Sequence, residues 1–520
     1  MSIERTAARG SFGARARAFV AAHPDTLAIG LILLVAISIR VAFAFRVPVF
    51  LLRDSVGYFL PAWDLLNGYG FDISIRRTPV YPAFLVGAMT LFGEELLAIS
   101  FAQHIVGVAS AVLVYILGRQ TVGRLAGLIA AIITALNGAL IVAEHYLMPE
   151  VVLIFLLLAT FVAFLAALKN ERRGAFFGAG ALLGLALLTK PVAQVLIPVL
   201  PFVLLISYRS VRRVVVPSLL IGAGLLAVMV PWVARNALEH GSATTAGALG
   251  QTLVARTAKH DTGFRWYDAD DADTYEHREG IARQLVQNGI RQRISDGVIY
   301  RRVQDRFVMS DTEINQFMRE LSTKVILENP GYYLRGTATM TWQLLRGEPE
   351  KLTTDWKTQN ARLSREEWDE RIEHLLSRAS IPQRNELENA STVVSLVQPP
   401  AWGPTMPVLF IIGSVVVALS AGHRPALLLS LSVLALLLTC AALDGPVVRY
   451  RYPADPLIAL VAAGALTIGV PWLYRLASSL RNRPAIARTR TAPNVPAASA
   501  TASASTSGAA SAAGPASRGA

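Results

Sequence analysis

Residues 150–168 read EVVLIFLLLATFVAFLAAL, and from residue 151 onward this stretch contains no charged side chain. As an α-helix it rises about 27 Å, close to the ~30 Å thickness of the hydrocarbon core of a bilayer. Runs of the same kind recur along the chain. They lie near 26–46, 97–118, 125–143, 175–189, 191–207, 214–235, 404–421, 424–442 and 455–475. The sequence therefore predicts an all-α polytopic membrane protein with about ten transmembrane helices.

The composition agrees with this fold class. The chain has 520 residues, of which 53% are hydrophobic and 16% are charged, whereas soluble domains carry about 25% charged residues. The single cysteine, Cys440, lies inside an apolar run and excludes a disulfide framework. The formal charge of +13 comes from short basic clusters between the apolar runs. Membrane topology explains such clusters, so they give no reason to expect a nucleic-acid partner.

The basic clusters also predict the orientation. A further apolar run at 80–93 is too short to cross a bilayer and is interpreted as an interfacial helix. With that run left out of the spans, all the clusters fall on one side, as the positive-inside rule demands. They are Arg5/Arg9/Arg15/Arg17, Arg119/Arg124, Lys169/Arg172/Arg173, Arg209/Arg212/Arg213, Arg424 and Arg475/Arg481/Arg483. Both termini are therefore expected in the cytoplasm.

A cleaved signal peptide is the alternative for the first run, because Ala42-Phe43-Ala44 has the small residues of a cleavage site. The run is longer than a typical signal-peptide core, and cleavage would upset the charge pattern. A retained first span is the preferred interpretation.

The topology divides the chain into five parts. They are a cytoplasmic N-terminus (1–25), an N-terminal transmembrane catalytic module (26–235), an outer domain (236–403), C-terminal transmembrane helices (404–475) and a basic, then disordered, tail (476–520). The outer segments are 47–96, 144–149, 236–403 and 443–454. Within 236–403, apolar residues at three- and four-residue spacing predict a helix. They are Ile314, Phe317, Met318, Leu321, Val325 and Ile326.

The first outer segment carries an acid and a pair of arginines. Asp54 follows the first span closely, which places it either for chemistry at the lipid surface or as the N-cap of a short helix. Arg76 and Arg77 precede the 80–93 run, and guanidinium groups suit phosphate oxygens. They could equally snorkel toward lipid headgroups.

Further charged residues are expected on the same side. Glu144 is interpreted as a span-end residue that faces water, and Glu150 as a functional candidate. Lys190 either faces an anionic headgroup or snorkels. Arg449 and Arg451 run against the positive-inside bias, and an anionic ligand gives the simplest reason for them. The acidic string at 268–276 lacks the spacing of a calcium loop and is interpreted as a solvated loop.

The ordered set of motifs resembles the C-type glycosyltransferase superfamily, specifically the bacterial branch akin to protein O-mannosyltransferases and the lipid A aminoarabinose transferase. The motifs are DSVGY (54–58), GYGF (68–71), RRTPVYPAFL (76–85), LFG (91–93), Gln103, PE (149–150), TKP (189–191), PWVARN (231–236) and RYRYPADP (449–456). The resemblance extends over nearly the whole chain except the tail and is weakest at 237–400.

The resemblance implies an enzyme of the bacterial inner membrane that uses a polyprenyl-phosphate-linked sugar as donor and a lipid, glycan or protein as acceptor. It implies that Asp54 is the catalytic carboxylate, Glu150 the second acid and Arg77 a residue of the donor phosphate site. Lys190, Arg449, Arg451, Tyr58 and Tyr81 complete the predicted substrate-binding set. Family members differ in metal use, and this sequence has no paired DxD in either loop, so a divalent metal cofactor is left open.

Elementary chemistry agrees with this reading. Basic side chains would stabilise the leaving phosphate, and Asp54 would accept the proton of the attacking hydroxyl, which gives inversion.

A secondary transporter would instead need charges or interrupted helices near the bilayer midplane. Arg40 is the exception in nearly uncharged runs, and it is expected to snorkel. A polysaccharide polymerase or ligase would not need an acid directly after the first span.

Overall fold

The computed structural model describes residues 22–44, 49, 53–270, 272–347, 405–420, 425–471, 474 and 478. Every regular element in these ranges is a helix. Residues 1–473 form one compact unit, and residues 474–520 form a second unit of which only two residues are described. The predicted tail, most of the predicted cytoplasmic N-terminus, Asp271 and the part of the predicted outer domain at 348–403 lie outside the described residues.

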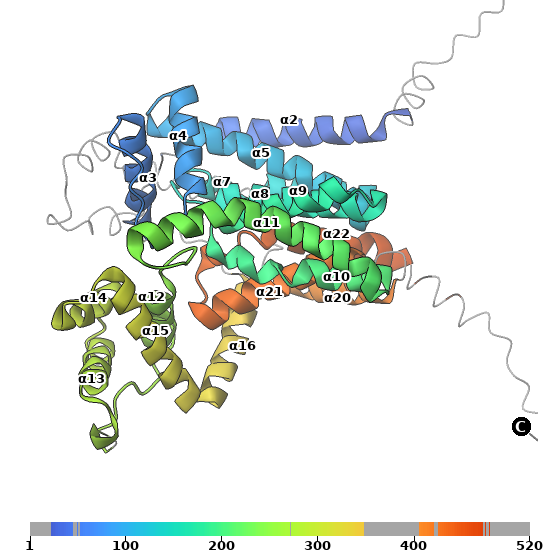
Figure 1. Cartoon of the computed structure of the whole chain (residues 1–520). Helices are drawn as coiled ribbons and strands as arrows, with labels where there is room; N and C mark the ends of the chain where they lie inside the picture. Colours follow the sequence, from blue (N-terminus) through green and yellow to red (C-terminus); the bar gives the residue numbers. More distant parts are fainter. Residues whose placement is uncertain are drawn as a thin grey trace, which may run out of the picture. The chain divides into compact units, whose positions relative to one another are not determined.

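Five helical stretches are long and apolar enough to cross a membrane. They are α2 (Pro24–Ala44), α5 (Leu96–Thr121), α8 (Glu150–Asn170), Pro191–Tyr208 and α11 (Val211–His240). Shorter apolar helices accompany them: α4 (Val80–Phe92), α6 (Arg124–Ala135), α9 (Arg173–Leu187), α20 (Thr405–Leu419), α21 (Leu427–Leu443) and α22 (Asp455–Gly464) with its π-helical continuation η8 (Ala465–Gly469). Figure 1 shows α2, α5, α8, α9 and α11 running side by side. The chain is a multi-pass membrane protein.

Two predicted spans are interrupted. The run 125–143 forms α6 and a separate short helix, α7 (Gly138–Ala143), so the prediction of one continuous span was wrong there. The side chain of Asn137 accepts hydrogen bonds from the backbone N–H groups of Ala139 and Leu140, which makes it the N-cap of α7. The run 191–207 begins as a 3-10 helix, η1 (Pro191–Leu196), and continues as α10 (Val199–Tyr208) after Pro198.

The helices approach one another closely where they carry glycine. On α9, a Cβ atom placed on Gly180 would lie 2.0 Å from the backbone oxygen of Ile221 in α11. On α11, a Cβ on Gly224 would lie 2.0 Å from the backbone oxygen of Phe177. The α5–α6 crossing uses Gly118 and Gly127 in the same way. Small residues at such crossings let membrane helices pack backbone to backbone.

The segment between α2 and α5 holds two helices, α3 (Arg53–Leu66) and α4, and the prediction of a short helix at 80–93 is confirmed. The start of α4 is fastened to the end of α9. The hydroxyl of Thr78 donates to the backbone oxygen of Thr189 (2.9 Å), and the N–H of Val80 donates to the backbone oxygen of Leu188 (3.1 Å). These bonds place the residues around Arg77 beside those around Lys190.

Residues 249–346 form helices α12 to α16. They are α12 (Leu249–Val254), the π-helix η2 (Ala255–Lys259), η3 (Ala272–Thr274), α13 (His277–Arg291), α14 (Asp296–Phe307), α15 (Asp311–Glu328) and α16 (Pro330–Arg346). A separate apolar core includes Phe264, Trp266 and Val286. On α15 the predicted apolar face is confirmed, because Ile314, Met318, Leu321 and Val325 are buried and Phe317 and Ile326 pack against them.

One end of the helical bundle is marked by an ion cluster. Asp25, at the start of α2, pairs with Arg119 at the end of α5 (3.0 Å) and Arg124 at the start of α6 (3.1 Å). The hydroxyl of Tyr115 also donates to Asp25. The start of α2 and the α5–α6 connection therefore lie at the same end, as the predicted topology requires.

Candidate functional site

Asp54 lies between two guanidinium groups that come from opposite ends of the chain. Its Oδ1 accepts a hydrogen bond from Nη2 of Arg77 (2.9 Å), and its Oδ2 accepts one from Nη2 of Arg449 (3.0 Å). Helix α3 already begins at Arg53, so Asp54 lies in its first turn and is not the N-cap. The structure therefore does not support the N-cap interpretation of Asp54, because both oxygens of its carboxylate contact residues outside α3.

Arg77 is oriented by α3. Its guanidinium lies over the ring of Tyr58, 4.6 Å from the centroid, and donates to the hydroxyl of Tyr58 (3.3 Å). A Cβ on Gly57 would lie 3.1 Å from Nε of Arg77, so the glycine of the DSVGY motif makes room for this side chain. Arg76 leaves in another direction and pairs with Asp311 at the start of α15 (2.8 Å). Only one of the two adjacent arginines therefore belongs to the site.

A second carboxylate completes the site. Glu150 is the first residue of α8 and its side chain is only 2% exposed. Its Oε1 accepts a hydrogen bond from Nζ of Lys190 (2.8 Å) and lies 3.9 Å from Nε of Arg449. Its Oε2 is buried and has no hydrogen-bond partner within the part of the chain that the structure describes. Lys190 pairs with an acid, so the snorkelling interpretation does not hold for it.

The aromatic residues of the site support the cations. The ammonium of Lys190 lies 4.7 Å from the ring centroid of Tyr450, and the guanidinium of Arg449 lies 5.9 Å from the same centroid. The hydroxyl of Tyr450 donates to Asp444. Sequence reasoning did not single out Tyr450 as a site residue, although its alternation with basic residues in RYRYP was the available signal.

Tyr81 is fully buried and contacts Tyr58. Its hydroxyl donates to Oε1 of Gln103 on α5 (2.9 Å), and its ring meets the ring of Tyr58 edge to face, with centroids 5.3 Å apart. Tyr81 therefore packs against Tyr58 and helps to hold its ring in position. Its predicted role in substrate binding stays a prediction.

Arg451 does not join the site. Its Nε lies 2.7 Å from Oδ1 of Asp455 at the start of α22, and both side chains are buried. The sequence predicted both Arg449 and Arg451 as substrate-binding residues, and the structure brings only Arg449 to Asp54. Residues Val448–Tyr450 form a 3-10 turn, in which side chains two positions apart point in different directions.

Two further expectations are corrected inside the bundle. Arg40 does not snorkel, and Glu144 does not face water, because their side chains are 4% and 2% exposed. They form a bidentate pair, from Nη2 of Arg40 to Oε1 of Glu144 (2.6 Å) and from Nε to Oε2 (2.8 Å). With the break between α6 and α7, this pair shows that the bundle does contain buried charge and interrupted helices.

The electrostatics of the site are set by its cations. Burial alone raises the pKa of Asp54, but the guanidinium groups of Arg449 and Arg77 outweigh it and hold the pKa well below its usual range. Burial lowers the pKa of Arg449, and the carboxylates of Asp54 and Glu150 more than restore it, so this pKa is raised. Asp54 is therefore ionised and Arg449 protonated over the whole physiological range.

The described side chains do not form a ready-made divalent metal centre of three or more protein ligands. Among the described residues, no three His, Cys, Asp or Glu side chains converge. Asp54 and Glu150 are the two carboxylates of the site, and both already bind Arg or Lys. Either carboxylate would have to leave its Arg or Lys partner before it could bind a divalent cation, whose remaining ligands would be waters or substrate phosphate oxygens.

Comparison with known proteins gives three findings. Residues 76–234 match the family model "Dolichyl-phosphate-mannose-protein mannosyltransferase". None of the curated proteins compared with the chain matches it. Nineteen chains of solved structures match.

Two of these structures illustrate the likeness. The oligosaccharyltransferase AglB from Archaeoglobus fulgidus, in complex with an inhibitory peptide and a dolichol-phosphate, is 15% identical, with a TM-score of 0.49; the match covers 89% of this chain and 52% of that one. The chain thus spans about half the length of AglB. ArnT from Cupriavidus metallidurans, bound to undecaprenyl phosphate, is 15% identical, with a TM-score of 0.37, 85% of this chain covered and 78% of that one. A likeness at this level does not identify an activity.

The family match includes Arg77, Glu150 and Lys190, whereas Asp54 and Arg449 lie outside it. It begins at the two arginines before α4 and ends inside α11. Over residues 76–234 the chain is therefore similar to this mannosyltransferase family, in agreement with the resemblance that its motifs predict.

Proposed function

We propose that the chain is an integral membrane glycosyltransferase, which moves a sugar from a polyprenyl-phosphate donor to an acceptor hydroxyl with inversion. The observation that carries the proposal is the convergence of Asp54, Arg77, Arg449, Glu150 and Lys190 on one site. Three cations suit a lipid-linked phosphate, and a carboxylate among them suits the transfer of a proton.

The donor phosphate binds by taking over the contacts that the carboxylates now make. Arg77 and Arg449 each present a guanidinium N–H to Asp54, and phosphate oxygens accept the same kind of hydrogen bond. Lys190 adds a point charge beside them. These cations then stabilise the negative charge that develops on the leaving phosphate.

The transfer itself is a single displacement. The acceptor oxygen forms a bond to the anomeric carbon, the bond from that carbon to the phosphate oxygen breaks, and the electron pair leaves with the phosphate. Asp54 takes the acceptor proton. While both arginines hold it, Asp54 is a weak base; transfer of those arginines to the phosphate raises its basicity at the moment a base is needed.

Glu150 has a supporting chemical role in this proposal. Its Oε1 fixes Lys190, and its buried Oε2 is an acceptor for a sugar hydroxyl. The same proposal places the site at the outer face of a bacterial inner membrane, with both termini in the cytoplasm and 236–403 as an outer domain. The acceptor is a lipid, glycan or protein hydroxyl.

The test uses the purified protein in lipid nanodiscs with a panel of undecaprenyl-phosphate sugars, membrane extract as the acceptor source, and release of undecaprenyl phosphate as the readout. Asp54→Asn should remain folded and lose turnover, since the change keeps the size and removes the base. Asp72→Asn is the matched control, because Asp72 is an acid in the same segment whose side chain is 94% exposed. Wild-type turnover in Asp54→Asn, or no release with any sugar of the panel, contradicts the proposal.

A further inference from the structure

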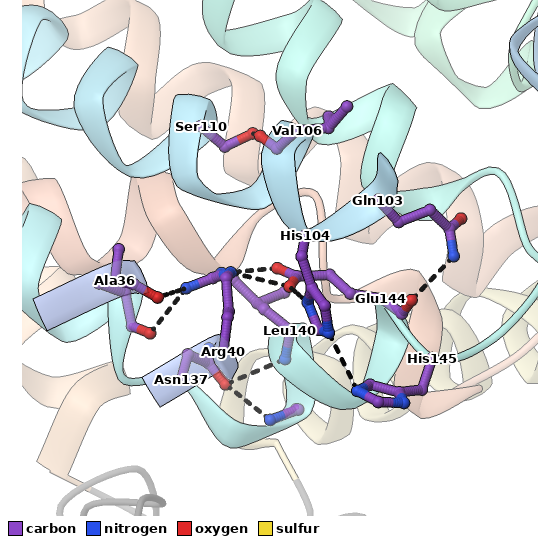
Figure 2. Close-up of polar contacts among 12 residues, drawn as sticks. Ala36, Arg40, Gln103, His104, Val106, Ser110, Asn137, Leu140, Glu144 and His145 are labelled. Atoms are coloured by element: carbon purple, nitrogen blue, oxygen red, sulfur yellow. Dashed lines mark hydrogen bonds and ion pairs between the residues drawn. The ribbon is translucent and has the colours of Figure 1, made fainter. Parts of the chain in front are cut away.

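The mechanism above does not use the ion pair inside the bundle. Arg40 on α2 pairs directly with Glu144, the residue after α7. His104 on α5 is the third member of the cluster, and its Nδ1 lies 2.5 Å from Oε2 of Glu144. Figure 2 shows the three side chains pointing toward one another, with His145 behind His104. Charged groups in a membrane bundle are costly to bury and need a reason.

The cluster gives each guanidinium nitrogen of Arg40 at least one acceptor. Besides its two bonds to Glu144, the guanidinium donates from Nη1 to the backbone oxygens of Ala36 and Ala135, each at 3.3 Å. The bonds reach three different elements, α2, α6 and the residue after α7. Glu144 is thus held at a fixed place relative to the surrounding helices.

The backbone of Glu144 is held as firmly as its side chain. Nε2 of Gln103 donates to the backbone oxygens of Glu144 and Tyr146, each at 2.9 Å, and the hydroxyl of Ser100 donates to the former at 3.0 Å. The residues that follow are buried, apart from the half-buried Tyr146, and six positions after Glu144 the chain reaches Glu150. The cluster therefore fixes the beginning of the turn that ends at the second carboxylate of the site.

Gln103 joins the cluster to the other half of the site as well. Its Oε1 accepts from the hydroxyl of Tyr81, whose ring supports the ring of Tyr58, which in turn lies beneath Arg77. Buried contacts thus connect Glu144 to Glu150 through the turn and to Arg77 through three side chains. A connection of this kind becomes a functional claim only when energetic coupling is measured.

We propose that Arg40, His104 and Glu144 form a positioning cluster that sets the place of Glu150 in the active site. The expected effect of the cluster on turnover rests on the proposed transferase function. The expected effect on the order of the turn 144–149, which is the structural part of the inference, does not depend on that function. The three residues touch no substrate; they act through Glu150.

The structure offers a way to displace Glu144 without altering any charge. A Cβ on Gly107 would lie 2.0 Å from Oε1 of Glu144 and 2.9 Å from Nη2 of Arg40. Gly107→Ala should therefore fold and push the pair aside, because the obstructing atoms are the ends of side chains. Gly178→Ala is the control for adding a methyl, since nothing lies within 4 Å of that position. Ser110→Ala is the control on α5, because the hydroxyl of Ser110 donates to the backbone oxygen of Val106 in its own helix (2.8 Å).

The first measurement is amide hydrogen exchange across residues 145–148 in nanodiscs, which needs no substrate. Glu144→Gln and Gly107→Ala should each speed exchange there at least about tenfold, while Gly178→Ala and Ser110→Ala should leave it as in the parent. Unchanged exchange in both Glu144→Gln and Gly107→Ala overturns the inference, whatever the activity.

The second measurement is a double-mutant cycle on turnover. Glu144→Gln should lower kcat about ten- to a hundredfold, because small misplacements of a catalytic group have effects of this size. In a Glu150→Gln background the same change should alter kcat less than about twofold, since the residue it positions is already disabled. Equal losses in both backgrounds overturn the positioning role. Faster exchange without transferase activity in the parent contradicts the proposed function and leaves the structural part intact.

Discussion

Both carboxylate oxygens of Asp54 are occupied in this structure, one by Arg77 and one by Arg449. A carboxylate held in this way is ionised but a weak base. Its reactivity is therefore controlled by whatever competes for the two guanidinium groups. At the scale of single residues, the proposed mechanism therefore has the arginines both bind the donor and regulate the base.

The depressed pKa of Asp54 predicts a pH dependence of stability. The folded-state pKa lies below the unfolded value of about 3.9. The stabilisation is therefore fully present above that unfolded value and is lost as the pH falls through the folded-state pKa. Thermal unfolding in detergent should show the parent losing stability relative to Asp54→Asn below about pH 4. Parallel curves for the two proteins down to pH 2 would mean that the arginines do not hold the carboxylate in solution.

Arg449 and Arg451 should respond differently to substitution. Arg449 contacts Asp54 and approaches Glu150, so Arg449→Ala should cost about 2–4 kcal/mol of transition-state stabilisation. Arg449→Lys should also weaken binding of undecaprenyl phosphate, since lysine cannot copy the guanidinium geometry.

Arg451 serves as the matched comparison. It pairs with Asp455, so Arg451→Lys should lower the melting temperature of the protein. Its affinity for undecaprenyl phosphate should stay close to that of the parent. Affinity measurements on undecaprenyl phosphate and thermal unfolding separate the two. If Arg451→Lys weakened binding of undecaprenyl phosphate more than Arg449→Lys did, the donor phosphate would not bind beside Arg449.

At the scale of helices, close backbone contact predicts where stability is sensitive. Gly180→Ala places a methyl 2.0 Å from the backbone oxygen of Ile221, so α9 and α11 must separate. We expect a loss of thermal stability in detergent of about 1–3 kcal/mol, the usual cost of overpacking. Gly178→Ala, two residues earlier on the same helix, should be neutral or stabilising because it meets open space. Equal stability of the two variants would show that the crossing is looser than described.

The helices were largely predictable from the sequence, because long uncharged runs have few alternatives in a membrane protein. The break between α6 and α7 was also readable, since Asn137-Gly138 is a turn signal inside the apolar run and Asn137 became an N-cap. The prediction of a single span there rested on the length of the apolar run alone. The α15 face was predictable because its three- and four-residue spacing is unambiguous.

The site was predictable only in part. Charge bias placed Asp54, Glu150 and Arg449 on one side of the membrane, and the structure does bring them together. Their pairing was not readable, since 395 positions separate Asp54 from Arg449. Arg40 was misread for a physical reason: a snorkelling arginine and one paired across the bundle have the same local sequence.

At the scale of the molecule, the predicted topology has a direct test by cysteine labelling. Cys440 is buried, so the parent should stay unlabelled by a thiol reagent that does not cross membranes. Single cysteines at Gln120 and Arg172 should be shielded in intact cells, and one at Thr323 should react; all three positions are exposed to solvent or lipid in the structure. Labelling of Gln120→Cys from outside would mean that α4 crosses the membrane.

The balance of charge in the site has a consequence for the end of the reaction. Three cations and two carboxylates leave one positive charge, which matches the single negative charge of a phosphodiester donor. In the proposed transfer the spent lipid becomes a phosphate monoester of about −1.5 to −2 at pH 7, while Asp54 has gained a proton. The cations of the site are thus expected to hold the product phosphate more strongly than the donor phosphate. In the proposed mechanism, departure of the polyprenyl phosphate requires Asp54 to lose its proton and reclaim Arg77 and Arg449, so deprotonation of Asp54 is coupled to product release.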